Sequence, residues 1–238
     1  MVKSLKVSSL QNLVRNSYLD EEKVRRELMR FAKGFTVVSY QKMDGFVVDL
    51  ARMNLSLEDV EKAANRIKPE KNRQVNLELL PFVEEYIQQR REYDYQEIDL
   101  RCYPLSRDLR VPFKSQFVLV NRCEVILPVF IFWRNKALDT GQMSLFMTLI
   151  KEILEQEPDL EDAKVQIVDF GAPKSKAPRT MEVIHGDEIE LLSEEEKIDR
   201  LAIYVNALKS VNDELARNST EAEKRPATTV DNNQLSFL

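Results

Sequence analysis

The spacing of apolar residues predicts a helical beginning for the chain. Between residues 10 and 31, apolar side chains recur every three or four positions, which is the period of one helix face. Two short apolar or β-branched runs follow at 35–40 and 46–50. The Asp-Gly pair between them favours a turn, so we expect a β-hairpin there. Residues 1–74 are therefore interpreted as a mainly helical region that includes a hairpin.

Two more helices are predicted before the pattern changes. Ser56 is a good N-cap residue, and the helix that follows should end near residue 67, because Lys68 precedes a proline. Another helix should span residues 76–91. Pro81 lies within it, and since proline is tolerated only in a first helical turn, we expect it close to the helix start.

The central part of the chain alternates between strand and helix patterns. Residues 95–102 show the two-residue period of a half-buried strand, and the apolar runs at 117–120 and 126–133 are typical of strands covered on both faces. Helical spacing returns at 140–154, and 165–170 is again strand-like. The order strand, strand, helix, strand predicts an α/β or α+β fold in which helices flank a central mixed sheet.

A long helix is predicted near the C-terminus. Ser193 and Glu196 form a capping box, and helical spacing continues to about residue 216. One stripe of this helix has near-heptad spacing; its residues are Ile198, Leu201, Val205, Leu208, Asn212 and Leu215. The stripe suits either packing within the chain or a homodimeric coiled coil. We assign residues 75–216 to the core with this helix and residues 217–238 to a polar, flexible tail.

Composition and charge narrow the function classes. The net charge of -5 and the pI near 5.3 argue against a broadly basic nucleic-acid surface, but a local basic patch stays open. Only 5 glycines argue against glycine-rich phosphate loops. Cys102 and Cys123 are too few for a disulfide framework, and we expect both to be buried thiols. Because neither a signal peptide nor a membrane-spanning apolar run is visible, we expect a cytoplasmic protein.

Few residues point to catalysis. The single histidine, His185, lies among polar residues, as is typical of an exposed turn. The sequence lacks the motifs of serine hydrolases, P-loop enzymes and zinc sites. Glu97 and Asp99 are two apart on a predicted strand, so they face the same way and could share a magnesium ion. A solvated polar face, continued by Arg101, explains the same pattern. We assign no catalytic residue and no cofactor.

The end of the chain carries a peptide with a recognisable pattern. The peptide consists of Gln234, Leu235, Ser236, Phe237 and Leu238. It resembles the pentapeptide Gln-Leu-Ser/Asp-Leu-Phe by which bacterial replication and repair proteins dock on the β sliding clamp, with the last two apolar residues exchanged. The resemblance implies that the glutamine hydrogen-bonds at the rim of a pocket while the apolar side chains fill it. In the alternative interpretations, the tail folds back on the protein's own core or binds another partner.

A second stretch, residues 142–146, also fits the clamp-binding pattern. It lies inside a predicted amphipathic helix, where Met143 and Phe146 should be buried. A docking peptide must be extended and accessible, so we expect no clamp binding from this stretch.

The central segment, residues 77–170, resembles the core of restriction-endonuclease-like PD-(D/E)xK nucleases. That family places an aspartate on one strand, and an acidic residue and a lysine on the next, before a helix. The matching positions here are Gln116, Phe130 and Phe132. Because phenyl rings neither ligate a metal nor polarise water, the resemblance implies a degenerate nuclease without activity.

These observations favour a bacterial or phage accessory protein of DNA replication or repair that is not an enzyme and is recruited to the clamp by its C-terminal peptide. Two alternatives stay open. One is a metal-dependent nuclease that uses Glu97, Asp99, Glu84 or Glu85. The other is an assembly protein that dimerises through residues 193–216.

Overall fold

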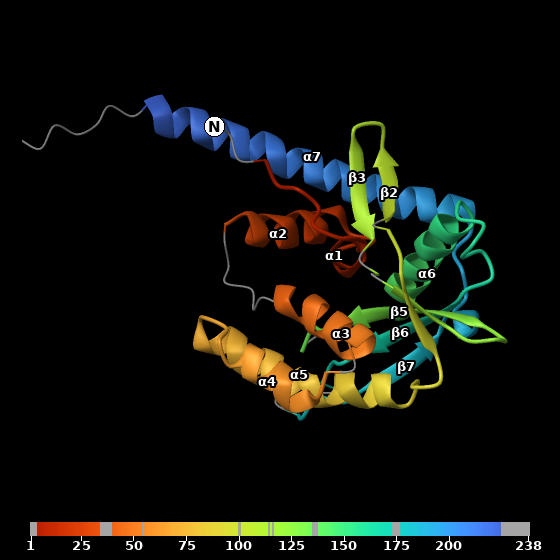
Figure 1. Cartoon of the computed structure of the whole chain (residues 1–238). Helices are drawn as coiled ribbons and strands as arrows, with labels where there is room; N and C mark the ends of the chain where they lie inside the picture. The colour runs from red at the N-terminus through yellow and green to blue at the C-terminus, as the bar shows by residue number, and fades with distance from the viewer. Residues whose placement is uncertain are drawn as a thin grey trace, which may run out of the picture.

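Figure 1 shows the computed structural model, which describes residues 4–33, 40–53, 55–99, 101–113, 115, 117–134, 138–172 and 177–224. Helices come first, strands follow, and a long helix comes last. The α-helices are α1 (Leu10–Arg15), α2 (Glu21–Ala32), α3 (Gln41–Met53), α4 (Leu57–Ala64), α5 (Glu70–Gln88), α6 (Thr140–Leu154) and α7 (Glu194–Lys224). The strands are β1 (Asp94–Glu97), β2 (Arg101–Ser106), β3 (Leu109–Phe113), β4 (Phe117–Val120), β5 (Val125–Ile131), β6 (Lys164–Asp169) and β7 (Glu182–His185), and a short 3₁₀ helix, Gly186–Glu188, follows β7.

The main sheet is mixed and has the order β1-β4-β5-β6-β7. Strands β1, β4 and β5 pair in antiparallel fashion, β5 pairs with β6 in parallel, and β7 returns antiparallel to β6. A parallel pair needs a crossover connection, and α6 supplies it between β5 and β6. The predicted order strand, strand, helix, strand is confirmed as β4, β5, α6 and β6, and so is the mixed α/β fold class.

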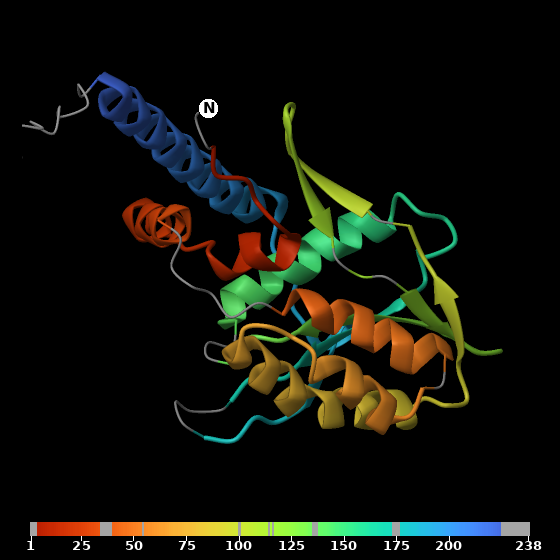
Figure 2. The same ribbon diagram turned by 60° about the vertical axis from the view of Figure 1, so that its left-hand side comes forward.

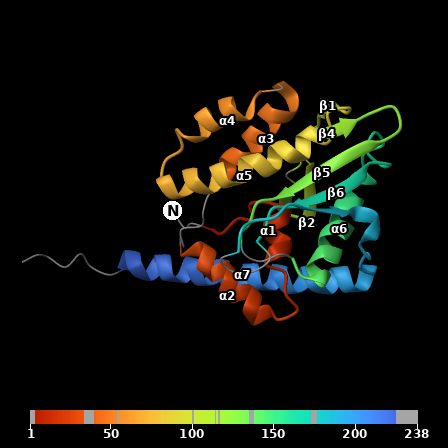
Figure 3. The same ribbon diagram turned by 90° about the horizontal axis from the view of Figure 1, so that it is seen from below.

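Helices cover both faces of the sheet and form two apolar cores. On one face, Leu127, Val129 and Ile131 of β5 pack with residues of α1, α2, α6 and α7. On the other face, Ile126 and Phe132 pack with residues of α3, α4 and α5. Figure 3 shows the sheet between these two helical layers. Alternate side chains of one strand thus enter different cores, which explains the nearly continuous apolar run in the sequence.

Strands β2 and β3 form a separate two-stranded hairpin beside α6 (Figure 2). The hydroxyl of Tyr103 in β2 donates to Glu152 of α6 at 2.9 Å, and Lys197 of α7 donates to the other oxygen of Glu152 at 2.5 Å. The hairpin, α6 and the start of α7 are therefore joined through one carboxylate.

The predicted caps at the starts of α4 and α7 are confirmed. Ser56 caps α4 by accepting a hydrogen bond from the backbone N–H of Asp59. Ser193 and Glu196 form the expected reciprocal box at the start of α7, with bonds of 3.0 Å and 3.3 Å. These helix starts depend on residues three positions apart, so the sequence alone was sufficient to predict them.

The predicted β-hairpin in the N-terminal region is wrong. Residues 46–50 belong to α3, and the residues at 35–39 lie outside the described part of the chain. Met43, Phe46, Val47 and Leu50 recur at helical spacing and are all buried, so one continuous face packs against the second core. The Asp-Gly pair falls in the first turns of this helix, where packing of the apolar face outweighs its preference for a turn.

Three element boundaries also differ from expectation. Helix α5 begins at Glu70, so Pro81 lies in its interior; the buried side chains of Leu79, Leu80 and Val83 around the proline anchor the helix against the sheet. The strand expected over 95–102 is divided between β1 and β2, which belong to different sheets. Helix α7 continues to Lys224, so the first part of the predicted flexible tail is helical.

Within the described residues, no helix combines the length and the apolar character needed to cross a bilayer.

The two cysteines are exposed, contrary to the expectation of buried thiols. Cys102 points outward from the two-stranded hairpin, between residues of alternating burial. Cys123 lies in the polar turn between β4 and β5, where its backbone N–H donates to the side chain of Asn121 at 2.8 Å. Burial of cysteine is a statistical tendency, and the position in a short hairpin or turn overrides it here.

Candidate functional site

The C-terminal peptide follows α7 in the sequence, and nine residues separate Lys224 from Gln234. The peptide itself, with Gln234, Leu235, Ser236, Phe237 and Leu238, lies outside the described residues, and its docking role stays a prediction. The last turns of α7, dark blue in Figure 1, extend beyond α2 and away from the sheet. The described part of α7 therefore ends at the periphery of the molecule.

Helix α7 is held along its length by the N-terminal part of the chain. Tyr204, Ala207 and Val211 are buried against the body. The side chain of Asn212 accepts a hydrogen bond from the backbone N–H of Leu5 at 2.7 Å. Because Asn212 and Leu208 of the proposed heptad stripe face the chain itself, much of that stripe is an internal packing surface. Dimerisation through residues 193–216 stays a prediction.

The second clamp-like stretch, residues 142–146, lies in the first turns of α6 and is buried. Gln142 is 1% exposed, and Leu145 and Phe146 are fully buried. The side chain of Gln142 completes a capping box with Asp139 and donates to the carbonyl of Arg15 at 3.0 Å. The expectation that this stretch is inaccessible is confirmed for Gln142, Ser144, Leu145 and Phe146, which are buried, whereas Met143 is only partly buried.

Phe130 and Phe132, which the nuclease resemblance would place at metal-ligand positions, lie in a stack of aromatic rings. Phe130 lies 6.0 Å from Phe132 and 6.1 Å from Phe170 between ring centroids, and the three rings are nearly parallel. Tyr86 of α5 meets Phe130 edge-on at 5.5 Å. Gln116 lies outside the described residues. The two phenylalanines thus converge in the second core, where their packing contributes to stability and offers no oxygen to a cation.

A buried arginine joins the carboxyl ends of β5 and β6. Arg179 has a side-chain exposure of 0% and donates to the carbonyl oxygens of Phe132 at 3.0 Å and Phe170 at 2.9 Å. It also donates to Glu78 of α5 at 3.2 Å and to the hydroxyl of Tyr40 at 3.1 Å. Four segments are therefore fixed by one guanidinium, which presents its donors in a planar fork.

Glu78 receives a second ion pair from Arg134. Partial burial raises the pKa of Glu78, but hydrogen bonds from Arg134 and Arg179 outweigh it, so the net pKa lies below the ordinary value. Sequence reasoning missed this network, because Glu78 and Arg179 are 101 positions apart and neither belongs to a recognisable motif.

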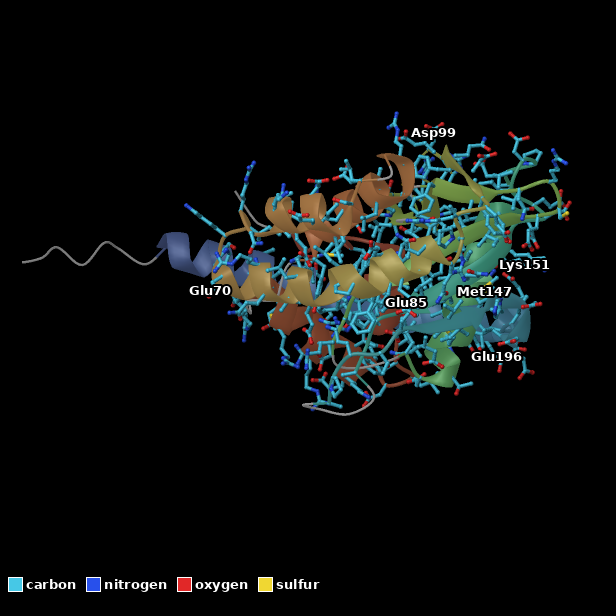
Figure 4. The ribbon with its side chains drawn as sticks, turned by 60° about the horizontal axis from the view of Figure 1, so that its bottom comes forward. Glu70, Glu85, Asp99, Met147, Lys151 and Glu196 are labelled. Carbon is cyan, nitrogen blue, oxygen red and sulfur yellow. The ribbon has the colours of Figure 1, made fainter. Side chains whose placement is uncertain are left out.

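The carboxylates considered for magnesium do not form one site. Glu97 ends β1 and pairs with Arg52 at 3.4 Å, while Asp99 lies after the strand. Glu84 and Glu85 lie on α5, and Figure 4 places Asp99 well away from Glu85. In the part of the chain that the structure describes, no three His, Cys, Asp or Glu side chains gather as metal ligands.

His185 lines an open groove of 780 Å³ between α6 and the edge of β6 and β7. Met147 and Lys151, labelled in Figure 4, form part of its wall. Both charge signs occur there, and Lys164 is paired with Glu124 at 2.7 Å. No hydrogen bond or ion pair of the His185 side chain is found within the described residues, and we assign it no catalytic role.

Comparison of the sequence with models of known protein families identifies the family of this chain. The model of a family described as "Sliding clamp-binding bacterial toxin SocB" matches residues 12–217. This chain belongs to the SocB family. No curated protein matches the sequence.

The SocB match extends from α1 into α7 and covers both cores and the Arg179 network. It includes the buried stretch 142–146 and ends before 234–238. Membership therefore concerns the folded body, and the identity of the docking residues is a separate question.

Proposed function

We propose that this chain is a toxin that binds the bacterial β sliding clamp and inhibits DNA replication by occupying the clamp's peptide-binding cleft. The docking residues in this proposal are Gln234, Leu235, Ser236, Phe237 and Leu238. Membership of the SocB family, described as clamp-binding toxins, is the observation that carries the proposal. The sequence by itself favoured an accessory role in replication or repair, and the family description favours an inhibitory one.

The peptide has the chemistry that such a cleft requires. Gln234 would hydrogen-bond at the rim, while Leu235, Phe237 and Leu238 would enter apolar pockets, as the resemblance to clamp-binding peptides implies. Replication and repair proteins use the same kind of peptide, so a toxin in the cleft excludes them by competition. A short peptide that orders on binding has a moderate affinity, and inhibition then depends on the toxin's concentration.

Two features of the body support the choice of peptide and mechanism. The other stretch that fits the pattern, 142–146, has all its side chains buried except that of Met143, which is partly buried. Phe130 and Phe132 pack with aromatic neighbours at the positions where a nuclease would hold metal ligands. Inhibition by occupancy is therefore favoured over cleavage of DNA.

The binding test compares the full chain with two variants. One lacks residues 234–238, and the other carries Leu235→Ala and Phe237→Ala. A matched control carries Asn232→Ala and Asn233→Ala. Because apolar anchors dominate peptide recognition, both variants should bind purified clamp at least 100-fold more weakly, or about 2.7 kcal/mol, by calorimetry. The control should bind like the unaltered chain. Equal clamp affinity for all four proteins would refute the docking assignment.

The inhibition test uses clamp-dependent DNA synthesis with purified proteins. The full chain should slow synthesis, and added clamp should relieve the block, because occupancy is stoichiometric. The deletion variant should leave synthesis unchanged. Inhibition that persists with the deletion variant would show that the chain acts by another route.

A further inference from the structure

A basic hollow of 520 Å³ lies between α3, α4 and the amino end of α5. Its cationic residues are Lys42, Arg66 and Lys68, and the whole lining contains no acidic side chain. Lys42 is in the first turn of α3, and the other two belong to the connection between α4 and α5. In a chain with a net charge of -5, three convergent cations without an acid are a local exception.

The three cations are free to meet a ligand. All three side chains are exposed, and none forms an ion pair with another described residue. Neighbouring charges are paired: Lys62 with Glu58 at 2.9 Å, and Arg73 with Glu70 at 3.3 Å. Within the described residues, the positive charge of the basic hollow is therefore not neutralised by an ion pair.

The wall between the cations is apolar. Phe46, Ala63 and Ile67 line it, together with the amide-bearing Asn72. Lysine and arginine side chains, and amides such as that of Asn72, are common partners of nucleic-acid phosphates. We propose that the basic hollow binds the sugar-phosphate backbone of DNA.

The position of the basic hollow fits a protein that sits on a clamp. The amino end of α5, marked by Glu70 in Figure 4, and the carboxyl end of α7 lie toward the same side of the molecule in Figures 1, 3 and 4. The docking peptide follows Lys224 after nine residues in the sequence, so a clamp bound by it would be tethered to the end of α7. DNA threaded through the clamp is then a neighbouring polyanion. This placement rests on the proposed function; the charge and shape of the hollow do not.

The expected binding is weak and strongly dependent on salt. Each neutralised phosphate contributes a slope of about −0.9 in log affinity against log salt, so three contacts give about −2.7. Between 50 and 200 mM salt, affinity should then fall about 40-fold. Such a contact adds to clamp docking without requiring a particular base sequence.

The test measures binding of a fluorescent DNA duplex to the full chain without clamp. The test variant carries Lys42→Gln, Arg66→Gln and Lys68→Gln, and a matched control loses the same charge at the exposed residues Arg107, Arg110 and Lys209, each changed to Gln. At 50 mM salt the test variant should bind DNA at least tenfold more weakly, with a salt slope reduced by about 2 to 3. The control should stay within twofold of the unaltered chain, and circular dichroism should give equal thermal unfolding for all three proteins.

Several results would overturn the assignment. Test and control variants that lose affinity equally would show general charge effects. An acidic peptide without phosphate that binds the hollow more tightly than DNA, at matched ionic strength, would identify a protein ligand instead. The two proposals fail separately: the test variant should bind DNA-free clamp normally, while the chain lacking residues 234–238 should keep its affinity for DNA.

Discussion

The chain contains two clamp-like peptides, and the comparison between them shows that the pattern alone does not make a docking site. Residues 142–146 match the pattern within α6, where Leu145 and Phe146 are fully buried and Gln142 is 1% exposed. Residues 234–238 match it beyond Lys224, outside the described residues. Presenting the first peptide to a partner requires opening the core around α6, whereas the docking role of residues 234–238 is a proposal that the following experiments test.

If this comparison is right, substitutions in the body and in the C-terminal peptide have separable effects. Changes in the body should alter the free energy of unfolding and leave clamp affinity of the folded protein unchanged. Three substitutions in the body, at Phe146, Arg179 and Asp169, should therefore change stability without changing clamp affinity.

The largest effect is expected from Phe146→Ala in α6. The ring is fully buried in the first core, so its loss removes apolar contacts and leaves a cavity. The free energy of unfolding should fall by about 4 kcal/mol, and Tm by on the order of 10 °C. Clamp affinity, measured well below Tm, should be unchanged. A loss of clamp affinity with little loss of stability would instead assign docking to residues 142–146.

A somewhat smaller effect is expected from Arg179→Ala at the carboxyl ends of β5 and β6. The change leaves the carbonyl oxygens of Phe132 and Phe170 without their buried donor and removes one partner of Glu78. Unfolding by urea should show a loss of about 3 kcal/mol. The exposed Arg107→Ala is the control and should lie within about 0.5 kcal/mol of the unaltered chain. Similar stability for both variants would mean that the network does not hold the strand ends together.

The smallest effect, and one of opposite sign, is expected from Asp169→Asn at the end of β6. Burial raises the pKa of Asp169, although the backbone N–H of Gly171 donates to it at 2.8 Å and lowers the pKa in part. A carboxyl group whose pKa is raised on folding favours the folded state below its unfolded pKa, and this contribution is lost as pH rises. The charged form therefore costs stability at pH 7, and asparagine, which keeps the acceptor oxygen, removes that cost.

The Asp169→Asn variant should have a Tm higher by about 1–3 °C at pH 7, by scanning calorimetry. The difference should shrink as pH falls toward about 4, the region where an unfolded aspartate takes up its proton. A variant that is less stable at pH 7 would show that the charge on Asp169 has a favourable partner in the folded protein.

Local sequence patterns predicted a large part of the fold. The caps at Ser56 and Ser193, the central strands and α6 all follow from residues within a few positions of one another. The inaccessibility of residues 142–146 followed from the same helical spacing. Errors occurred where a local preference competed with distant packing: residues 46–50 joined a helix, and Pro81 was accepted inside α5.

The sequence by itself determined the α/β class, the cap positions and the presence of two clamp-like peptides, because each depends on short-range spacing or on residue identity. Only the tertiary structure decided which carboxylates pair with which cations, as Glu78 does with Arg179. It also decided which face of α7 is internal, and that Lys42, Arg66 and Lys68 surround one hollow. The physical reason is distance along the chain. Contacts between segments arise only when the sheet and its two helical layers come together, and no local pattern encodes which distant side chain will be the neighbour.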